Sequence, residues 1–417
     1  MAKQNLIAAL DIGGGKITAV AATLDQQKNI VKILAGKEFN CEGLEGGIVT
    51  DIRETTATII ETISYLEEAT QTDINALYIA LRGEHIESFT SKGTFNIARP
   101  DKEINIDDIE HAIAAAKSIP IKNNSEILST VPQGFYIDRQ PVKNPEGMEA
   151  TSIDVDVHIT TGLTATFNNL NRAFDRAKCD ITGRFYGLLC LADAVLTQEE
   201  KEMGALIIDL GKDNTSAGIY VDGALRCSYD IKLGSDLITS DIAKVLRISH
   251  KEAEKIKIDY GTAFPGDYNG ETEITISPLY GEKETKINRD YLLDIIRPRV
   301  QDLFDAVREK MQESGFFDCA STAVLTGGGS LLPGIQEQAR SSLNIKEVVC
   351  STIQRDLVEC DKEFLNPKYA TAVSLAYFVA KREMIDTSRG NSHSKGFFNK
   401  IIEAIKNFFR NSDFFGG

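Results

Sequence analysis

The chain has 417 residues, more than one hydrophobic core usually holds, and its 42% hydrophobic and 26% charged residues are typical of a globular protein. Its net charge of −15 argues against a nucleic-acid partner, because duplex binding needs a basic face. The seven cysteines include no CxxC pair, which favours reduced, mostly buried thiols. With no signal-peptide pattern and no run of roughly 20 apolar residues, we expect a cytoplasmic location.

The first element is a predicted hairpin. A strand at residues 6–10 is followed by a turn at residues 11–16, Asp-Ile-Gly-Gly-Gly-Lys, and by a second apolar run at residues 17–20. Glycines allow backbone amides to approach phosphate oxygens closely. Asp11 could orient metal-bound water and Lys16 could pair with a β- or γ-phosphate. Taken alone, such a turn is more often only a tight turn.

The plan of this hairpin recurs at residues 205–221. Asp209 and Gly211 are spaced like Asp11 and Gly13, at an offset of 198 residues. A repeat of this length predicts two domains of one fold, each opening with a hairpin whose turn carries an Asp and a Gly. Helical periods between the strands, such as Ile238, Ile242 and Val245, make the fold class α/β.

Residues 85–162 differ from their surroundings. They hold half of the ten prolines, a predicted helix near residues 106–118, and short alternating strands such as residues 153–159. We interpret this segment as an inserted small domain.

A third glycine cluster follows a predicted strand at residues 323–325. Its sequence, Thr-Gly-Gly-Gly-Ser at residues 326–330, leads into a helix, so free amides beside glycine backbone suit an adenosine or ribose phosphate. Neither GxxxxGK[ST] nor GxGxxG occurs, which excludes P-loop and Rossmann interpretations.

Near the C-terminus, the polar residues 386–394 have the composition of a flexible linker. Apolar residues beyond it recur at helical spacing on one face, and basic residues flank them, as in a helix that lies in a membrane interface. Packing of this helix on its own domain is the alternative. The predicted membrane-binding residues are Phe397, Phe398, Ile401, Ile402, Ile405, Phe408, Phe409, Lys400 and Lys406.

The order DIGGGK, DLGKDNTS, TGGGSLLPGI resembles the phosphate 1, phosphate 2 and adenosine motifs of the actin, Hsp70 and sugar-kinase superfamily. Within it, the chain is similar to the FtsA family of bacterial cell-division proteins over nearly its whole length. The stretches that carry this similarity are residues 43–51, 131–136 with 143–148, 238–243 and 253–257.

The resemblance implies an actin-like two-domain ATPase fold of class α/β, with four subdomains, an inserted FtsA-type subdomain and a C-terminal amphipathic helix. The expected divisions are 1–84 with 163–200 (subdomain 1A), 85–162 (inserted subdomain 1C), 201–228 with 304–384 (2A), 229–303 (2B), 385–395 (linker) and 396–411 (membrane-binding helix).

The resemblance also implies ATP and Mg²⁺ as cofactors. The expected ATP-binding residues are Asp11, Gly13, Gly14, Gly15, Lys16, Asp209, Gly211, Lys212, Asn214, Thr215, Glu254, Lys257, Gly327, Gly328 and Gly329, with Asp11 and Asp209 holding the metal through water. Surface helix charges are the alternative for Glu254 and Lys257.

Two departures from the family pattern are visible. Gly14 stands where relatives often have Ser or Thr, and Lys212-Asp213-Asn214 replaces a glycine-rich second loop. No residue stands out as a general base, so we expect slow or absent hydrolysis and a nucleotide that acts as a conformational ligand.

The resemblance implies ATP-dependent protofilaments of the chain itself on anionic lipid, peripheral on the cytoplasmic face of the membrane at the division site. The implied partners are other division proteins and the tubulin-like FtsZ, whose acidic-hydrophobic C-terminal peptide would meet Arg289, Arg297 and Arg299. Solvated helix charges are the alternative. Two other functions remain open: a sugar or acetate kinase, and an actin-like pilus or secretion assembly adaptor.

Overall fold

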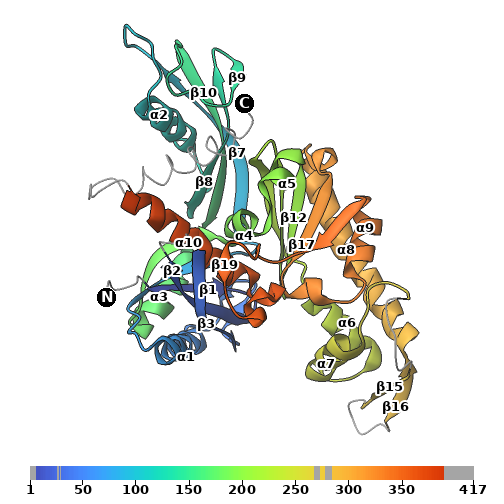
Figure 1. Ribbon diagram of the computed structural model, residues 1–417. Coiled ribbons are helices and arrows are strands. Elements are labelled where there is room, and N and C mark those ends of the chain that lie inside the picture. Colours follow the sequence, from blue (N-terminus) through green and yellow to red (C-terminus); the bar gives the residue numbers. More distant parts are fainter. Residues whose placement is uncertain (1–5, 26–27, 29, 267–272, 278–283, 389–417) are drawn as a thin grey trace.

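The computed structural model describes residues 6–25, 28, 30–266, 273–277 and 284–388. These residues form two large mixed sheets with helices packed on them and a smaller inserted sheet at one end (Figure 1). The mixed α/β fold predicted from the sequence is confirmed.

The first large sheet has the strand order β11-β6-β1-β2-β3-β19. The strand β1 (Leu6–Ile12) pairs antiparallel with β2 and parallel with β6. Alternate residues of β1 enter different cores: Leu10 packs with helices α1 and α3, whereas Ala9 packs with α4 and α10. Both faces of this strand are therefore covered, which explains its almost continuous apolar sequence. The other strands are β2 (Lys16–Asp25), β3 (Ile30–Asn40), β6 (Ala76–Leu81), β11 (Asp180–Tyr186) and β19 (Val358–Glu359), and the helices are α1 (Ile52–Thr70), α3 (Thr164–Ala177), α4 (Gly187–Val195) and α10 (Ala370–Ser388).

The second large sheet has the order β14-β13-β12-β17-β18 and repeats the plan of the first. Its strand β12 (Ala205–Leu210) pairs antiparallel with β13 (Thr215–Val221) and parallel with β17 (Thr322–Thr326). One face packs on α6 and α8, and the other meets α4, which thus lies between the two sheets. The remaining elements of this half are β14 (Ala224–Ile231), β18 (Glu347–Cys350), α5 (Gln198–Met203), α6 (Asp236–Leu246), α7 (His250–Tyr260), β15 (Glu273–Ile276), β16 (Thr285–Asn288), α8 (Arg289–Glu313) and α9 (Ile335–Leu343).

The insertion is a sheet of order β7-β10-β8-β9 backed by one helix, α2 (Ile106–Lys117). Asn105 caps α2 through a capping box with Asp108, and the helix buries its apolar face on the sheet. In Figure 1 the insertion projects from the two large sheets. Its strands are β7 (Ile86–Asn96), β8 (Ser125–Ile137), β9 (Gln140–Val142) and β10 (Ser152–Leu163). The alternating strand expected at 153–159 is thus longer than its polar and apolar alternation suggests.

Polar side chains join the insertion to the second large sheet. Gln133 donates hydrogen bonds to the carbonyl oxygens of Leu225 and Arg226 on β14, at 2.6 and 2.8 Å. His158 Nε2 lies 3.0 Å from Ser228 Oγ, and both side chains are buried. The insertion therefore contacts both halves, although the chain enters and leaves it from the first.

The last part of the described chain, β19 and α10, returns to the first half, which corrects the expected 304–384 boundary. The strand β19 pairs with β3, and α10 buries Val373 and Ala376 against the first sheet. Such a return depends on long-range pairing, which local patterns do not reveal. The helix α10 also runs through Ser388, so the first residues of the expected linker are helical. Residues 389–395 lie outside the described residues.

One helix and one predicted apolar stripe differ from their local sequence patterns. The helix α8 continues through Pro298, because apolar residues on both sides of the proline are buried in the second core. Val245 is exposed, whereas Ile238 and Ile242 of the same predicted stripe are buried. All seven cysteines are free thiols, and Cys319 and Cys350 are exposed.

Candidate functional site

The first hairpin turn lies at residues 13–15, between β1 and β2. The Gly13 amide donates to the Lys16 carbonyl at 3.0 Å, and Gly15 has a φ of +73°, a conformation that glycine adopts without strain. Lys16 lies at the start of β2, where its ammonium pairs with Glu38. Its predicted phosphate contact would require it to leave this partner.

The second turn, residues 211–214, closes in the same way. The Gly211 amide donates to the Asn214 carbonyl at 3.0 Å. Thr215 is buried and its hydroxyl donates to the Leu233 carbonyl at 2.7 Å. This side chain therefore holds the second turn against the segment that follows β14.

The two turns face each other. A Cβ added to Gly14 would lie 2.2 Å from Asp213 Oδ2, and one added to Gly15 would lie 2.8 Å from Lys212 Nζ. Asp213 is fixed in this position by the Gly46 amide, which donates to its Oδ2 at 2.8 Å. The two departures from the family pattern therefore meet in one contact. The glycines of the first turn leave room for the side chains of Lys212 and Asp213 on the second turn.

Arg82 lies between the two hairpin aspartates and was missed in the sequence analysis. It follows β6, and its guanidinium donates to Asp11 through Nη2 and to Asp209 through Nη1. Both carboxylates are almost fully buried. Burial raises the pKa of Asp11, although the Arg82 charge opposes that shift. The only sequence signal is position, because Arg82 directly follows a strand parallel to β1.

Asp230 on β14 forms a second buried polar contact beside Arg82. It accepts hydrogen bonds from the Gly83 amide at 3.2 Å, the Tyr186 hydroxyl at 2.7 Å and the Ser216 hydroxyl at 2.5 Å. Burial outweighs these bonds and raises the pKa of Asp230 to about 6. This cluster links the start of the insertion to the second hairpin.

The third glycine loop follows β17 and packs against the second hairpin. Gly327 has a φ of +80°, and a Cβ added there would lie 2.2 Å from Asp209 Oδ1. The loop continues through a 3-10 turn, Gly328–Leu331, into α9. It is also braced by the chain after α7, since the Ala263 amide donates to the Pro333 carbonyl at 2.7 Å.

The structure pairs two of the predicted ATP-binding residues, Glu254 and Lys257, with each other. Lys257 Nζ lies 2.7 Å from Glu254 Oε2 and donates to Thr239 Oγ1 at 2.8 Å. Lys257 is buried and Glu254 is partly exposed. Burial raises and the Lys257 ammonium lowers the pKa of Glu254, and the net shift is downward. The alternative of solvated helix charges therefore does not describe Lys257, which is buried in this ion pair.

Several buried polar atoms in this region have no hydrogen-bond partner among the described residues. Asp11 Oδ1, Asp209 Oδ1, Asn214 Oδ1, Arg82 Nε and Thr326 Oγ1 belong to this group. Buried polar groups are normally paired, so their concentration around the three loops indicates a polar ligand or water between the halves.

The three arginines of the predicted peptide site differ in their engagement. Arg299 Nε donates to Asp241 at 2.6 Å, and Arg289 Nε donates to the Tyr260 carbonyl at 2.8 Å. Arg297 is exposed, with its guanidinium carbon 5.9 Å from the centroid of the Phe264 ring. Arg297 is thus the most accessible of the three.

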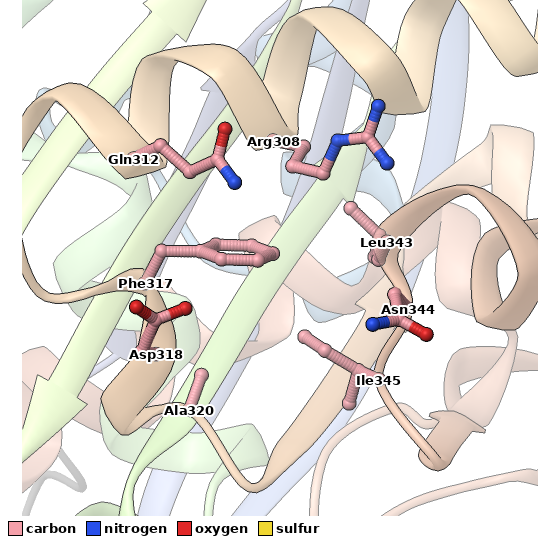
Figure 2. A pocket seen from close by; sticks show the side chains of 8 residues that line it. All are labelled: Arg308, Gln312, Phe317, Asp318, Ala320, Leu343, Asn344 and Ile345. Carbon is pink, nitrogen blue, oxygen red and sulfur yellow. The ribbon is translucent and has the colours of Figure 1, made fainter.

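A cavity of about 450 Å³ lies away from the loops, between the end of α8 and the end of α9. Phe317 and Leu343 contribute apolar walls, and Arg308, Gln312 and Asn344 contribute polar groups (Figure 2). Arg308 donates to the Ser342 carbonyl at 2.6 Å. None of the predicted nucleotide residues lines this cavity.

The predicted membrane-binding residues, 397–409, lie outside the described residues. Among the residues that are described, no helix is long and apolar enough to cross a membrane. Within the same residues, no group of three or more His, Cys, Asp or Glu side chains is placed to hold a metal ion.

Comparison with known proteins identifies the family. The family model of "Cell division protein FtsA" matches residues 206–374, and that of "SHS2 domain inserted in FTSA" matches residues 83–161. FtsA of Borreliella burgdorferi is 30% identical over 97% of this chain and 98% of that protein. FtsA of Neisseria meningitidis serogroup B is 32% identical over 91% of this chain and 92% of that protein.

Solved structures identify the fold. The PilM–PilN type IV pilus biogenesis complex aligns with a TM-score of 0.64 at 17% identity, covering 91% of this chain and 99% of that one. MreB5 of Spiroplasma citri bound to ADP aligns with a TM-score of 0.55 at 12% identity, covering 93% and 99%. These similarities confirm an actin-like fold. The two family models and the two relatives show that this chain belongs to the FtsA family of cell-division proteins.

Proposed function

We propose that the chain is an ATP-binding, actin-like protein that assembles on the cytoplasmic face of the membrane and tethers the FtsZ ring there. One observation carries the nucleotide part: the three glycine-bearing loops predicted from the sequence converge. The first turn contacts the second through Gly14 and Asp213, and the third loop contacts Asp209 through Gly327. Backbone amides from glycine loops and a helix start are the donors that phosphates use.

ATP would act as a conformational ligand. The two turns belong to different halves and touch directly, so phosphates that enter between them must separate the halves. Binding energy that differs between the closed and separated states would shift their populations. Hydrolysis would be slow or absent. ATP would bind without Mg²⁺, because both carboxylates expected to hold the metal are bonded to Arg82.

Membrane attachment rests on the sequence pattern after residue 394. Each Lys or Arg near an anionic leaflet contributes roughly 1 kcal/mol, so one short helix should bind reversibly. Polymerisation would raise avidity by about 10² to 10⁴ without new contacts. The FtsZ peptide would dock beside α8, where Arg297 is the most accessible of the three predicted arginines. Other division proteins would bind elsewhere.

Co-sedimentation with anionic liposomes tests the tether. We expect the full-length protein to pellet, and more strongly with ATP, whereas a version that ends at Ser394 stays in the supernatant. Phe408→Glu and Asn407→Glu give a matched pair, because each adds one negative charge but only the first changes the apolar face.

Pelleting should be lost in Phe408→Glu and largely kept in Asn407→Glu. Equal pelleting of full-length and truncated protein, or of neither, would remove the tether from the proposal.

A further inference from the structure

The place between the two phosphate-loop aspartates is taken by a side chain of the chain itself. The side chains of Arg82, Asp11 and Asp209 are 14%, 5% and 2% exposed, and the guanidinium is bonded to one oxygen of each carboxylate. It also lies beside the second turn, since a Cβ added to Gly211 would be 3.5 Å from Arg82 Nη1. Arg82 therefore contacts both halves at the point where their loops meet.

The register of the two sheets shows that this arginine is specific to the first half. Asp11 is paired with Ala80 on β6, and Asp209 is paired with Thr326 on β17. Two residues after the paired residue, the first half has Arg82 and the second has Gly328. The position that is Gly328 in the second half therefore carries a permanently charged side chain, Arg82, in the first half.

Arg82 is charged in this environment. Burial by itself lowers the pKa of Arg82, but the charges of Asp11, Asp209 and Asp230 reverse that effect and raise it above its ordinary value. The guanidinium offers five donors, of which two face the carboxylates and Nε has no partner among the described residues. It can therefore donate hydrogen bonds to further anionic oxygens.

A metal held between Asp11 and Asp209 does not fit this arrangement. One oxygen of each carboxylate is bonded to Arg82, and Asp209 Oδ1, the remaining oxygen on that side, is packed against Gly327. A divalent cation between the carboxylates would lie beside the buried guanidinium with little water to screen the repulsion. Arg82 already supplies positive charge at that place.

We propose that Arg82 is the resident cation of the nucleotide site, that its guanidinium binds the ATP phosphates directly, and that ATP binding by this chain does not require a divalent metal. This inference rests on the proposed nucleotide-binding function and defines its chemistry further. A guanidinium suits the role because its planar fork matches two phosphate oxygens at once. It also stays charged at every physiological pH.

The test is isothermal titration calorimetry of ATP into the full-length protein, once with excess MgCl₂ and once with excess EDTA. For the wild type we expect the two dissociation constants to agree within about threefold. For Arg82→Gln we expect affinity in EDTA to fall about tenfold or more, with MgCl₂ restoring much of it, because a cation can then enter between the freed carboxylates. Arg82→Lys should lie between them, because it keeps charge without the fork.

Arg226→Gln is the matched control. Arg226 is also a largely buried arginine that pairs with an aspartate, Asp222, but it lies on β14 beside the insertion. We expect its ATP affinity to be equal with MgCl₂ and with EDTA, like that of the wild type.

Two outcomes overturn the inference in distinguishable ways. Wild-type protein that binds ATP only with MgCl₂ contradicts the resident cation and leaves nucleotide binding intact. Folded wild-type protein that binds ATP under neither condition removes both the inference and the nucleotide function. If Arg82→Gln does not fold, the wild-type comparison and Arg82→Lys still decide the question.

Discussion

The two hairpin turns close with the same backbone hydrogen bond but differ in their side chains. The first has three glycines, Gly13 to Gly15, and the second has Lys212, Asp213 and Asn214. In the structure the second fills the space that the first leaves open, with Asp213 against Gly14 and Lys212 against Gly15. The two departures from the family pattern are therefore complementary parts of one interface.

The third loop should be the least tolerant of an added side chain. Gly327 combines a positive φ with contact to a buried carboxylate, so we expect Gly327→Ala to lower the free energy of unfolding by about 3 to 4 kcal/mol. Gly147 has a similar φ of +82° but no neighbour within 4 Å, so Gly147→Ala should cost only about 1 to 2 kcal/mol. Urea denaturation measures both, and equal losses would show that backbone strain alone explains the effect.

The two halves also differ in the elements that contact the third strand of each, β3 and β14. The third strand of the first half, β3, pairs with β19, whereas β14 of the second half contacts the insertion through Ser228 and His158. Burial lowers the pKa of His158 to about 4. Because the folded protein resists protonation of this group, its contribution to stability is complete above the ordinary pKa of 6.5 and is lost as the pH falls toward 4.

We therefore expect His158→Gln to reduce the acid sensitivity of the protein. Between pH 7 and pH 4.5, the wild type should lose about 2 to 3 kcal/mol more unfolding free energy than the variant. His111→Gln, which changes an exposed histidine of the same insertion, is the control variant. His85, which is also buried, is unchanged in the wild type and in the variants. Identical pH profiles for wild type and His158→Gln would contradict the assignment.

A double-mutant cycle measures the contact between the turns directly. Gly14→Ser places a side chain on Asp213, and Asp213→Gly removes the obstacle. We expect the two changes together to be less destabilising than the sum of the single changes, by about 1 to 2 kcal/mol. Strict additivity in thermal unfolding would mean that the turns do not touch in solution.

Local sequence was sufficient to predict the three loops, because strand, glycine and helix signals lie within a few residues of one another. It was not sufficient for the contacts between them. Arg82 is 71 residues from Asp11 and 127 from Asp209, and its only local signal is that it directly follows a strand. Asp230 and the pairing of β19 with β3 were missed for the same reason, since both depend on how distant strands align.

Hydrogen exchange of the full-length protein with and without ATP tests the central claim most directly, namely that the three converging loops are the nucleotide site. We predict that ATP slows amide exchange in residues 11–16, 209–216 and 326–335 together, and leaves the cavity between α8 and α9 unchanged. Protection confined to that cavity, or to one loop without the other two, would contradict the account.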